Sequence, residues 1–450
     1  MTGDDRTGVG GGQPTRGDEG GGGEPTRGSE DGQTAPHAED TGDGQTAPHA
    51  GDTGDGRAAP HAEDTGPDRR PFTDGGEDRG RLRGSLDRAA DRMLEASTYE
   101  RVGIAIGSTA LALAIGLVIV AAAGYNPAHF ARDVALGSFG SERAIARTLQ
   151  QTTLFILAGV AVAIAFRAGV FNIGVQGQLI VGGIGCVLSI VWLAPFLPNG
   201  TGGGIVLLLV GLTVSVVMGG LYAALPGVLK AHYGANEIIT TIMLNFIAIG
   251  VVGWAVDGPL RPDDARSVRT EYLPDNVGLP QVVFDNPNFS IVGLGLALAV
   301  VVAVAMLMSR TRFGYDMVTS GHQEPAATYS GVPAARMIVA TMTLSGMVAG
   351  LVGAIFAIMI QGYFIDPSGI GTYGFDAIAV SLLAANNPLG VVPAALLFGA
   401  LDASGSYVQI NTGVPIQLID GIVGLVVLFV AAPELFRMIA RRTDLGGDPR

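Results

Sequence analysis

The chain has 450 residues, of which 48% are hydrophobic, and a formal net charge of −13. Its first 100 residues hold 22 acidic residues against 11 arginines, so most of the negative charge belongs to this part. A basic surface of the kind that binds nucleic acid is absent, which excludes nucleic acid as a partner. The single cysteine, Cys186, excludes an internal disulfide and a cysteine-rich metal site.

Residues 1–78 are predicted to be a disordered acidic tail. A twelve-residue unit occurs three times, as DGQTAPHAEDTG (31–42), DGQTAPHAGDTG (43–54) and DGRAAPHAEDTG (55–66). Because Gly, Pro, Asp and Thr dominate, the tail has too little apolar surface to offset the entropy cost of ordering it. Its three regularly spaced histidines lie too far apart along a flexible chain to assemble a metal site. Residues 79–101, in which leucines interleave with arginines, are predicted to form an amphipathic helix on the membrane surface.

Beyond residue 100 the chain is a series of apolar runs, which predicts an all-α bundle of transmembrane helices over residues 102–440. Most runs reach the roughly 20 residues that cross a hydrocarbon core. The eighth and ninth are short or broken by polar residues, so we expect them to be half-spanning or tilted. Ten spans are predicted, with eight or nine as alternatives. The runs are 102–123, 148–166, 174–194, 203–229, 238–256, 289–308, 337–360, 375–386, 388–405 and 415–432.

The placement of cationic residues predicts the orientation in the membrane. With ten spans and a cytoplasmic N-terminus, the short outer segments 195–202, 361–374 and 406–414 contain no Lys or Arg. The segment 124–147 argues the other way, because it would lie outside with three arginines. The balance is still the inside-positive bias, so both termini are predicted to be cytoplasmic, in the cell membrane. The cations on the inner side are Arg167, Lys230, Arg310, Arg312, Arg336, Arg437, Arg441 and Arg442.

Lys230 is the only lysine in the chain, and its context excludes one common route to ATP binding. A phosphate-cradling P-loop needs Lys after a glycine-rich loop and before Ser or Thr, whereas Lys230 precedes Ala231. The HExxH, CxxC and GxSxG motifs are also absent. We therefore expect no catalytic residue, no metal and no cofactor held by this chain. One lysine beside 40 acidic residues also favours a GC-rich genome and a salt-loving organism.

The cytoplasmic segment 310–336, RTRFGYDMVTSGHQEPAATYSGVPAAR, is longer than a plain connector needs to be. Pro325 fits the first turn of a short helix, and the small residues after it allow another surface to approach closely. We expect a short helix along the membrane face, presented to a partner protein. The alternative is a simple connector. The residues predicted to make this contact are Gly321, His322, Gln323, Glu324, Pro325, Ala326, Ala327, Tyr329 and Gly331.

This segment resembles the loop of the permease subunits of ATP-binding-cassette importers, in the branched-chain amino acid, ribose and nucleoside branch. The family pattern is T-x-F-G-x-x-x-x-x-x-G-x-N-x-x-A-A-x-Y-x-G-I, followed by S-G-x-x-A-G-x-x-G. The chain departs from it at Gln323, where Asn is usual, and at Val332, where Ile is usual. The matching residues are Thr311, Phe313, Gly314, Gly321, Ala326, Ala327, Tyr329, Gly331, Ser345, Gly346, Ala349, Gly350 and Gly353.

Three further stretches resemble the same family, in the same order, over roughly residues 100–440. The sequence FNIGVQGQ (171–178) is similar to the F-N-I-G-x-E-G-Q of nucleoside-type permeases, with Gln176 in place of Glu. The sequence GANEIITTIMLN (234–245) is similar to G-x-N-E-V-x-x-T-x-M-L-N. The sequence GFDAIAV (374–380), followed by NNPLG (386–390), completes the set.

Polar side chains inside the apolar runs are costly, and they face either a cavity or another helix. Glu237, Thr241 and Asn245 differ by four positions, so they share one helix face. Amides donate and accept hydrogen bonds without demanding charge, which suits a neutral solute rich in hydroxyl groups. The alternative is that these residues hold helices together. The predicted path-lining residues are Asn172, Gln176, Gln178, Thr241, Asn245, Asp376 and Asn386; Glu237, near the cytoplasmic end, is instead expected to cap a helix or contact a partner.

The resemblance implies a permease subunit that works by alternating access, driven by a separate ATPase subunit that binds the ATP. It also implies a second permease subunit, identical or paired, and an extracellular substrate-binding lipoprotein. The FNIG-type stretch favours nucleosides as cargo, with simple sugars and then branched-chain amino acids as alternatives. A different class of protein remains open, a secondary transporter coupled to ions, for which Asp402 and Asp420 are the candidate ion-binding groups. A membrane-bound enzyme is disfavoured by the missing catalytic motifs.

Overall fold

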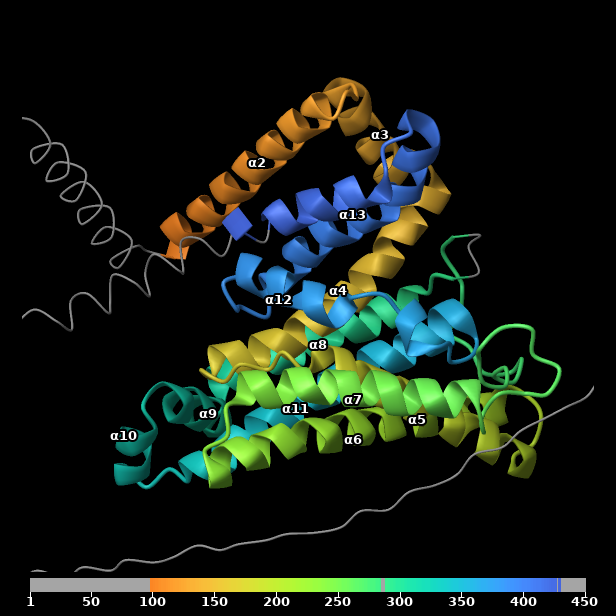
Figure 1. The fold of residues 1–450 in the computed structure, drawn as a ribbon. Coiled ribbons are helices and arrows are strands. Elements are labelled where there is room, and N and C mark those ends of the chain that lie inside the picture. Colours follow the sequence, from red (N-terminus) through yellow and green to blue (C-terminus); the bar gives the residue numbers. More distant parts are fainter. Residues whose placement is uncertain (1–97, 285–287, 427, 430–450) are drawn as a thin grey trace, which may run out of the picture. The chain divides into compact units, whose positions relative to one another are not determined.

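The computed structural model describes residues 98–284, 288–426 and 428–429, and within them it is helical (Figure 1). The only β-type pairing there is an isolated bridge between Arg269 and Ile365. The acidic tail (1–78) and nearly all of the amphipathic segment (79–101) lie outside the described residues. The elements are α2 (Thr98–Ala122), α3 (Pro127–Phe139), α4 (Glu142–Arg167), α5 (Val175–Leu193), η1 (Ala194–Phe196), α6 (Thr201–Tyr233), α7 (Glu237–Asp257), α8 (Ile291–Arg310), α9 (Arg312–His322), α10 (Glu324–Tyr329), α11 (Ala334–Ile355), η2 (Phe356–Gln361), η3 (Pro367–Gly369), α12 (Tyr373–Leu383) and α13 (Val391–Thr412). A helix at Ile416–Val426 follows.

Seven helical segments in the described residues are long and apolar enough to cross a membrane, which confirms the all-α, multi-pass prediction. These are Glu142–Arg167, Val175–Phe196, Thr201–Tyr233, Glu237–Asp257, Ile291–Arg310, Ala334–Gln361 and Val391–Thr412. Of the other three predicted runs, 102–123 coincides with the 25-residue α2 and 375–386 coincides with α12. The run 415–432 is helical over Ile416–Val426 and lies partly outside the described residues, so the count of ten is approximate. The eighth run is α12, whose 11 residues extend about 16 Å, roughly half of a hydrocarbon core.

Two elements differ from what the apolar runs predicted. Helix α3 lies in a segment that was expected to be a loop, and it begins where the Asn126 side chain accepts hydrogen bonds from the first backbone N–H groups. The ninth run was expected to end at residue 405, yet α13 continues to Thr412. Its polar residues are accommodated because Ser404, buried, donates to its own helix at the Leu401 carbonyl.

Helices α4, α5, α6 and α11 form the core, and glycines set the spacing between them. The apolar stretch of α4 is 83% buried, the most of any candidate span. A Cβ added to Gly219 would lie 2.4 Å from the Gly346 carbonyl oxygen, and one added to Gly182 would lie 2.4 Å from the Gly350 Cα. Because no side chain fits there, the backbones approach closely, as small residues permit between membrane helices. By contrast α7 exposes a strip of large apolar side chains that includes Phe246 and Trp254, as expected of a lipid-facing helix.

The two ends of the bundle carry different segments. Figure 1 shows α9 and α10 at the left, beside the C-terminal end of α6, whereas the long green connection between α7 and α8 lies at the right. Lys230, Arg312 and Arg336 belong to elements that begin or end at the left. These three predicted inner cations thus lie at the end that carries α9 and α10, whereas Arg437, Arg441 and Arg442 lie outside the described residues.

Candidate functional site

The predicted amides lie together at the N-terminal end of α5. Asn172, Gln176, Gln178, Thr241 and Asn245 are all buried, none more than 3% exposed. They come from three places in the chain: the turn before α5, the first turns of α5, and α7. Their hydrogen bonds reach α4, α11 and α12. We call this group, with Ser345 of α11, the amide cluster.

Asn172 and Gln178 form a reciprocal amide pair within the cluster. Asn172 Nδ2 donates to Gln178 Oε1 at 2.9 Å, and Gln178 Nε2 donates back to Asn172 Oδ1 at 2.9 Å. Asn172 Nδ2 also donates to Ser345 Oγ at 2.8 Å, and Ser345 Oγ donates to the Ala161 carbonyl of α4 at 2.6 Å. One asparagine therefore connects the FNIG turn to α5 and α11, and through Ser345 to α4.

Asn245 of α7 supplies the N-terminal cap that α5 lacks in its own sequence. Gly174 precedes α5 and has no side chain to accept from the first backbone N–H groups. Asn245 Oδ1 accepts from the Gly177 N–H at 2.8 Å, and Asn245 Nδ2 donates to the Ile173 carbonyl at 2.9 Å. The cap is thus provided across 68 residues of sequence, and it ties α7 to α5.

Gln176 makes an equivalent contact with α12. Its Nε2 donates to the Gly371 carbonyl at 2.8 Å, and its Oε1 accepts from the Gly374 N–H in the first turn of α12 at 2.8 Å. Gly374 is required for the approach, because a Cβ there would lie 2.3 Å from the Gln176 backbone nitrogen. An ionised Glu, which the related pattern has here, accepts hydrogen bonds only and has no proton for the Gly371 carbonyl.

The polar atoms of the amide cluster are therefore bonded to protein. Thr241 fits the same description, since its hydroxyl donates to the Glu237 carbonyl of its own helix at 2.6 Å. This arrangement favours the alternative that these residues hold helices together; a path along them stays a prediction. Glu237 itself pairs with Lys230 across the α6–α7 connection.

Asp376 and Asn386 lie at either end of α12, and the hydrogen bonds of their side chains go to Thr372 and Ser381 rather than to the amide cluster. Asp376 Oδ2 accepts from the Thr372 hydroxyl at 2.8 Å in the first turn. Asn386 follows the helix with a φ of +56°, a left-handed conformation that Asn tolerates better than most residues, and its Oδ1 accepts from Ser381 at 2.9 Å. Asn386 thus terminates α12.

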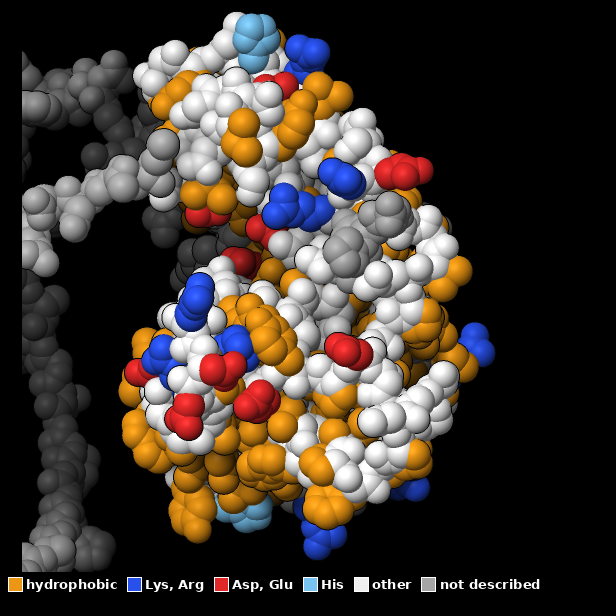
Figure 2. Space-filling model, turned by 90° about the vertical axis from the view of Figure 1, so that its right-hand side faces the viewer, with side chains coloured by type: hydrophobic (Ala, Val, Ile, Leu, Met, Phe, Trp, Pro, Cys, Tyr) orange, Lys and Arg blue, Asp and Glu red, His pale blue; other side chains and the backbone are white. Residues whose placement is uncertain are grey.

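Asp376 belongs to a second set of polar residues, which also includes Asp402, Asp420, Arg147, Gln151 and Tyr373. We call this set the carboxylate group. Asp402 of α13 interacts electrostatically with Asp376, with Asp420 of the last described helix and with Arg147 of α4. No ion pair joins them among the described residues. Beside them the Tyr373 hydroxyl donates to Gln151 Oε1 at 3.0 Å. Figure 2 shows one face of the molecule, on which acidic and basic side chains gather around a hollow.

Three members of this group were missed by the sequence analysis: Arg147, Gln151 and Tyr373. Arg147 was counted only as a charge in an outer segment. Gln150 and Gln151 begin the polar stretch QQTT (150–153) near the start of a predicted span, which was a signal for Gln151. Asp402 and Asp420 were found, but only as candidate ion-binding groups, whereas in the structure Arg147 is close enough to Asp402 to interact with it electrostatically.

The segment 310–336 folds as two helices, α9 and α10, and includes the short helix that was predicted. Thr311 caps α9 by accepting from the Gly314 N–H at 3.0 Å, and Pro325 lies in the first turn of α10. At the end of α9 the backbone of Gly321 rests on the turn after α4. A Cβ on Gly321 would lie 1.3 Å from the Ala168 carbonyl oxygen. Ala168 precedes Asn172 by four residues, so α9 contacts the short stretch of chain that leads to the amide cluster.

Helix α10 presents its side chains to the outside. Ala327 is fully buried and anchors the helix, whereas Glu324, Pro325 and Ala326 are exposed. Tyr329 is 96% exposed. Gly331 ends the turn with a φ of +83°, which glycine adopts without strain. A nearly bare tyrosine on a short projecting helix is typical of a surface that contacts another protein.

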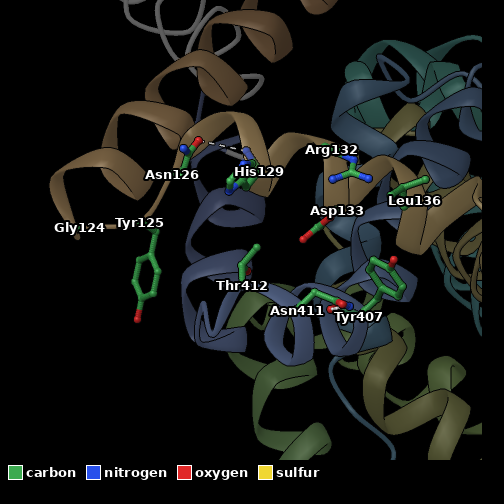
Figure 3. Close-up of a pocket in the computed structure, with 10 residues that line it drawn as sticks. All are labelled: Gly124, Tyr125, Asn126, His129, Arg132, Asp133, Leu136, Tyr407, Asn411 and Thr412. Carbon is green, nitrogen blue, oxygen red and sulfur yellow. Dashed lines mark hydrogen bonds between the residues drawn. The ribbon is translucent and has the colours of Figure 1, made fainter.

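A polar cavity of about 560 Å³ lies between α3 and the end of α13, and no motif indicated it. Figure 3 shows that α3 contributes His129, Arg132 and Asp133, and that α13 contributes Tyr407 and Asn411. The turn at Asn126, which starts α3, positions these side chains. The segments around it were predicted to be outer segments.

Comparison with known proteins adds an independent finding. The family model described as branched-chain amino acid transport system / permease component matches residues 144–431. The chain is 32% identical to the guanosine ABC transporter permease protein NupP of Bacillus subtilis, over 73% of this chain and 92% of that protein. It is 29% identical to the nucleoside ABC transporter permease protein NupB of Lactococcus lactis, over 72% and 89%. It is 32% identical to the glucose ABC transporter permease protein TsgB13 of Haloferax volcanii, over 72% and 86%.

Proposed function

Since the chain belongs to the family of permease components of branched-chain amino acid transport systems, we propose that it is the membrane-spanning subunit of an importer for nucleosides, driven by a separate ATPase. The chain itself is a non-enzymatic transport subunit. The ATP and any metal that accompanies it belong to the partner, and this chain holds no cofactor. A second permease subunit, identical or paired, completes the pathway through the membrane.

The observation that carries the proposal is the exposed helix α10. Its exposed side chains, from Glu324 to Tyr329, project at the end of the bundle where the inner cations gather. An ATPase subunit on the cytoplasmic side needs such a surface, because its movement can be transmitted to the membrane-spanning helices only through a rigid contact. We propose this orientation for a protein of the cell membrane, with both termini on the cytoplasmic side, from the inside-positive bias of the sequence.

The same geometry suggests how motion at α10 reaches the helices. Helix α9 contacts the turn after α4 through Gly321, and that turn leads to Asn172. From Asn172 the amide cluster connects α4, α5, α7 and α11, and Gln176 extends the connection to α12. A movement of α9 would therefore shift these helices as a unit. Coupling of two sites through a packed, hydrogen-bonded chain is physically reasonable, and it needs a mutational test.

The carboxylate group supports a hydroxyl-rich cargo. It stands on α4, α12, α13 and the helix Ile416–Val426, near the ends predicted to face outward. Carboxylate oxygens accept hydrogen bonds from hydroxyl groups such as those of ribose. Two of the three relatives described above are named as guanosine or nucleoside permeases and the third as a glucose permease, so a simple sugar is the second candidate. An extracellular substrate-binding lipoprotein would deliver the solute at the outer end, where the cavity beside α3 offers polar contacts.

Uptake of labelled guanosine and labelled glucose tests the proposed cargo. Cells that carry the gene are compared with cells that lack it, each with excess unlabelled ribose as a competitor. We expect loss of guanosine uptake on deletion, with no effect of ribose and no change in glucose uptake. Loss of glucose uptake alone would move the assignment to a sugar, and an Asp402→Asn variant with unchanged guanosine uptake would remove the carboxylate group from the path.

Tyr329→Ala is expected to weaken assembly with the ATPase without weakening the fold. Because Tyr329 is 96% exposed in the subunit alone, its removal should leave the melting temperature within about a degree, whereas a buried aromatic anchor at an interface contributes about 2 kcal/mol or more. Co-purification with the ATPase from solubilised membranes measures the effect, and we expect at least about a tenfold loss. Tyr315→Ala, a 68% exposed tyrosine of α9, is the matched control. If both variants retain the ATPase equally, Tyr329 does not anchor the contact with the ATPase, which would contradict the proposed role of α10.

A further inference from the structure

An apolar groove lies between α6 and α11 at the end of the bundle that carries α9 and α10. Its volume is about 430 Å³, and its walls include Val228 of α6, Phe313 of α9, and Ala340 and Leu344 of α11. The groove exists because α11 comes very close to α6 at Gly227, where an added Cβ would lie 3.2 Å from the Val339 Cα. The side chains on either side of that contact then form the two walls.

The groove has a polar mouth at one end only. His232, near the end of α6, and Arg336, near the start of α11, both line it and are exposed. Among the described residues neither of them takes part in an ion pair. Arginine stays charged and forms directed hydrogen bonds with phosphate. This end of the groove therefore offers a cation and an imidazole, whereas the rest of the groove has almost no other polar group.

The direction and length of the groove match one leaflet of a bilayer. One face of α6 carries Leu221, Leu225, Val228 and His232. Along this face the side chains change from exposed leucines to an imidazole toward the cytoplasmic end. On α11 the lining runs from Arg336 to Met347, a rise of about 16 Å, which is close to half the thickness of a hydrocarbon core. A molecule with an anionic head group and a long apolar tail therefore matches the groove, with the head group at Arg336 and His232 and the tail along the apolar walls.

We propose that this groove binds an anionic phospholipid of the cytoplasmic leaflet, with its phosphate at Arg336 and His232 and an acyl chain along α6 and α11. Basic pockets between transmembrane helices on the cytoplasmic side are suited to such head groups. Because Phe313 at the start of α9 lines the groove, the bound lipid holds the segment that leads to α10 against α6 and α11. The inference rests on the membrane orientation proposed above and does not depend on the identity of the cargo.

Native mass spectrometry of the full-length protein tests the proposal. The protein is exchanged into detergent that contains equal amounts of phosphatidylglycerol and phosphatidylethanolamine with the same acyl chains. We expect preferential retention of phosphatidylglycerol, reduced about fivefold by Arg336→Gln, the order of effect of one cationic contact. Arg310→Gln is the matched control, because Arg310 is exposed at the same end and does not line the groove. Ala340→Phe, which fills the slot, should reduce retention in the same way.

Three outcomes would overturn the proposal. The first is equal retention of the two lipids by the unmodified protein, and the second is an equal loss in the Arg336 and Arg310 variants. The third is a dimer that excludes lipid until it dissociates, which would mean that a second copy of the chain covers the groove. The measurement needs no transport. If the protein retains phosphatidylglycerol but the cells show no nucleoside uptake, the proposed cargo is wrong and the lipid proposal is unaffected.

Discussion

Replacing Gly321 with alanine is expected to abolish most transport activity. The backbone of Gly321 lies against the turn after α4, so the new methyl group would stand 1.3 Å from the Ala168 carbonyl oxygen and 2.4 Å from its carbon. These are backbone atoms, so no side-chain rotation can relieve the overlap, and α9 must move away from the turn. Overpacking of this kind costs about 1–3 kcal/mol or more. We expect a lower melting temperature and at least about a tenfold loss of uptake, because the contact that joins α9 to the amide cluster is displaced.

Gly250→Ala is the matched control for this variant. Gly250 lies in α7, is exposed, and has no atom within 4 Å of an added Cβ. Alanine is better than glycine in a helix by up to about 1 kcal/mol, so stability should be unchanged or slightly higher. Normal uptake by the Gly321 variant, together with an unchanged melting temperature, would show that α9 does not communicate through this turn.

The second large effect is expected from Gln176→Leu. Leucine has nearly the volume of glutamine, but it leaves the Gly374 N–H without an acceptor and the Gly371 carbonyl without a donor. Each unsatisfied buried group costs about 1–3 kcal/mol, so the free energy of unfolding should fall by about 2–4 kcal/mol. The first turn of α12 would loosen, and the carboxylate group would lose the fixed position of Tyr373 and Asp376. Thermal unfolding in detergent and nucleoside uptake measure the two consequences.

Gln409→Leu provides the comparison for Gln176→Leu. Gln409 is an exposed residue near the end of α13, so the same substitution there should change stability by no more than about 0.5 kcal/mol. If both leucine variants unfold at the same temperature, the contact between α5 and α12 contributes nothing to stability. If Gln176→Leu is destabilised but transports normally, α12 does not need a fixed position for the transport cycle.

The family and the helical character were predictable because they depend on local pattern. Apolar runs of about 20 residues follow from the thickness of a membrane, whatever the rest of the fold does. The segment around Pro325 predicted a short helix from the residue types alone, and α10 is that helix. The four motifs predicted a permease of this family, which the comparisons confirm. The packing role of Gly182 and Gly219 was likewise readable, since small residues in membrane helices permit close contact.

The partners of the polar residues depended on the tertiary structure. Asn172, Gln176 and Asn245 were recognisable as unusual in apolar surroundings, but nothing local distinguishes an amide that lines a path from one that caps a distant helix. Asn245 caps α5 from 68 residues away, and Gln176 bonds with Gly374 across 198 residues. The end of α13 was not predictable either, since the helix continues to Thr412, seven residues beyond the predicted boundary at 405.

The sequence by itself determined that this protein is a multi-pass, all-helical permease with a short helix after Pro325, because hydropathy, helix-breaking residues and motif spacing are properties of neighbouring residues. Only the tertiary structure decided which polar groups form hydrogen bonds between helices. It brought Arg147, Asp376 and Asp402 into one electrostatic group, and it placed Gly321 on the turn beside the amide cluster. The physical reason is that a hydrogen bond or a close backbone contact depends on distance in space, which a linear pattern does not record.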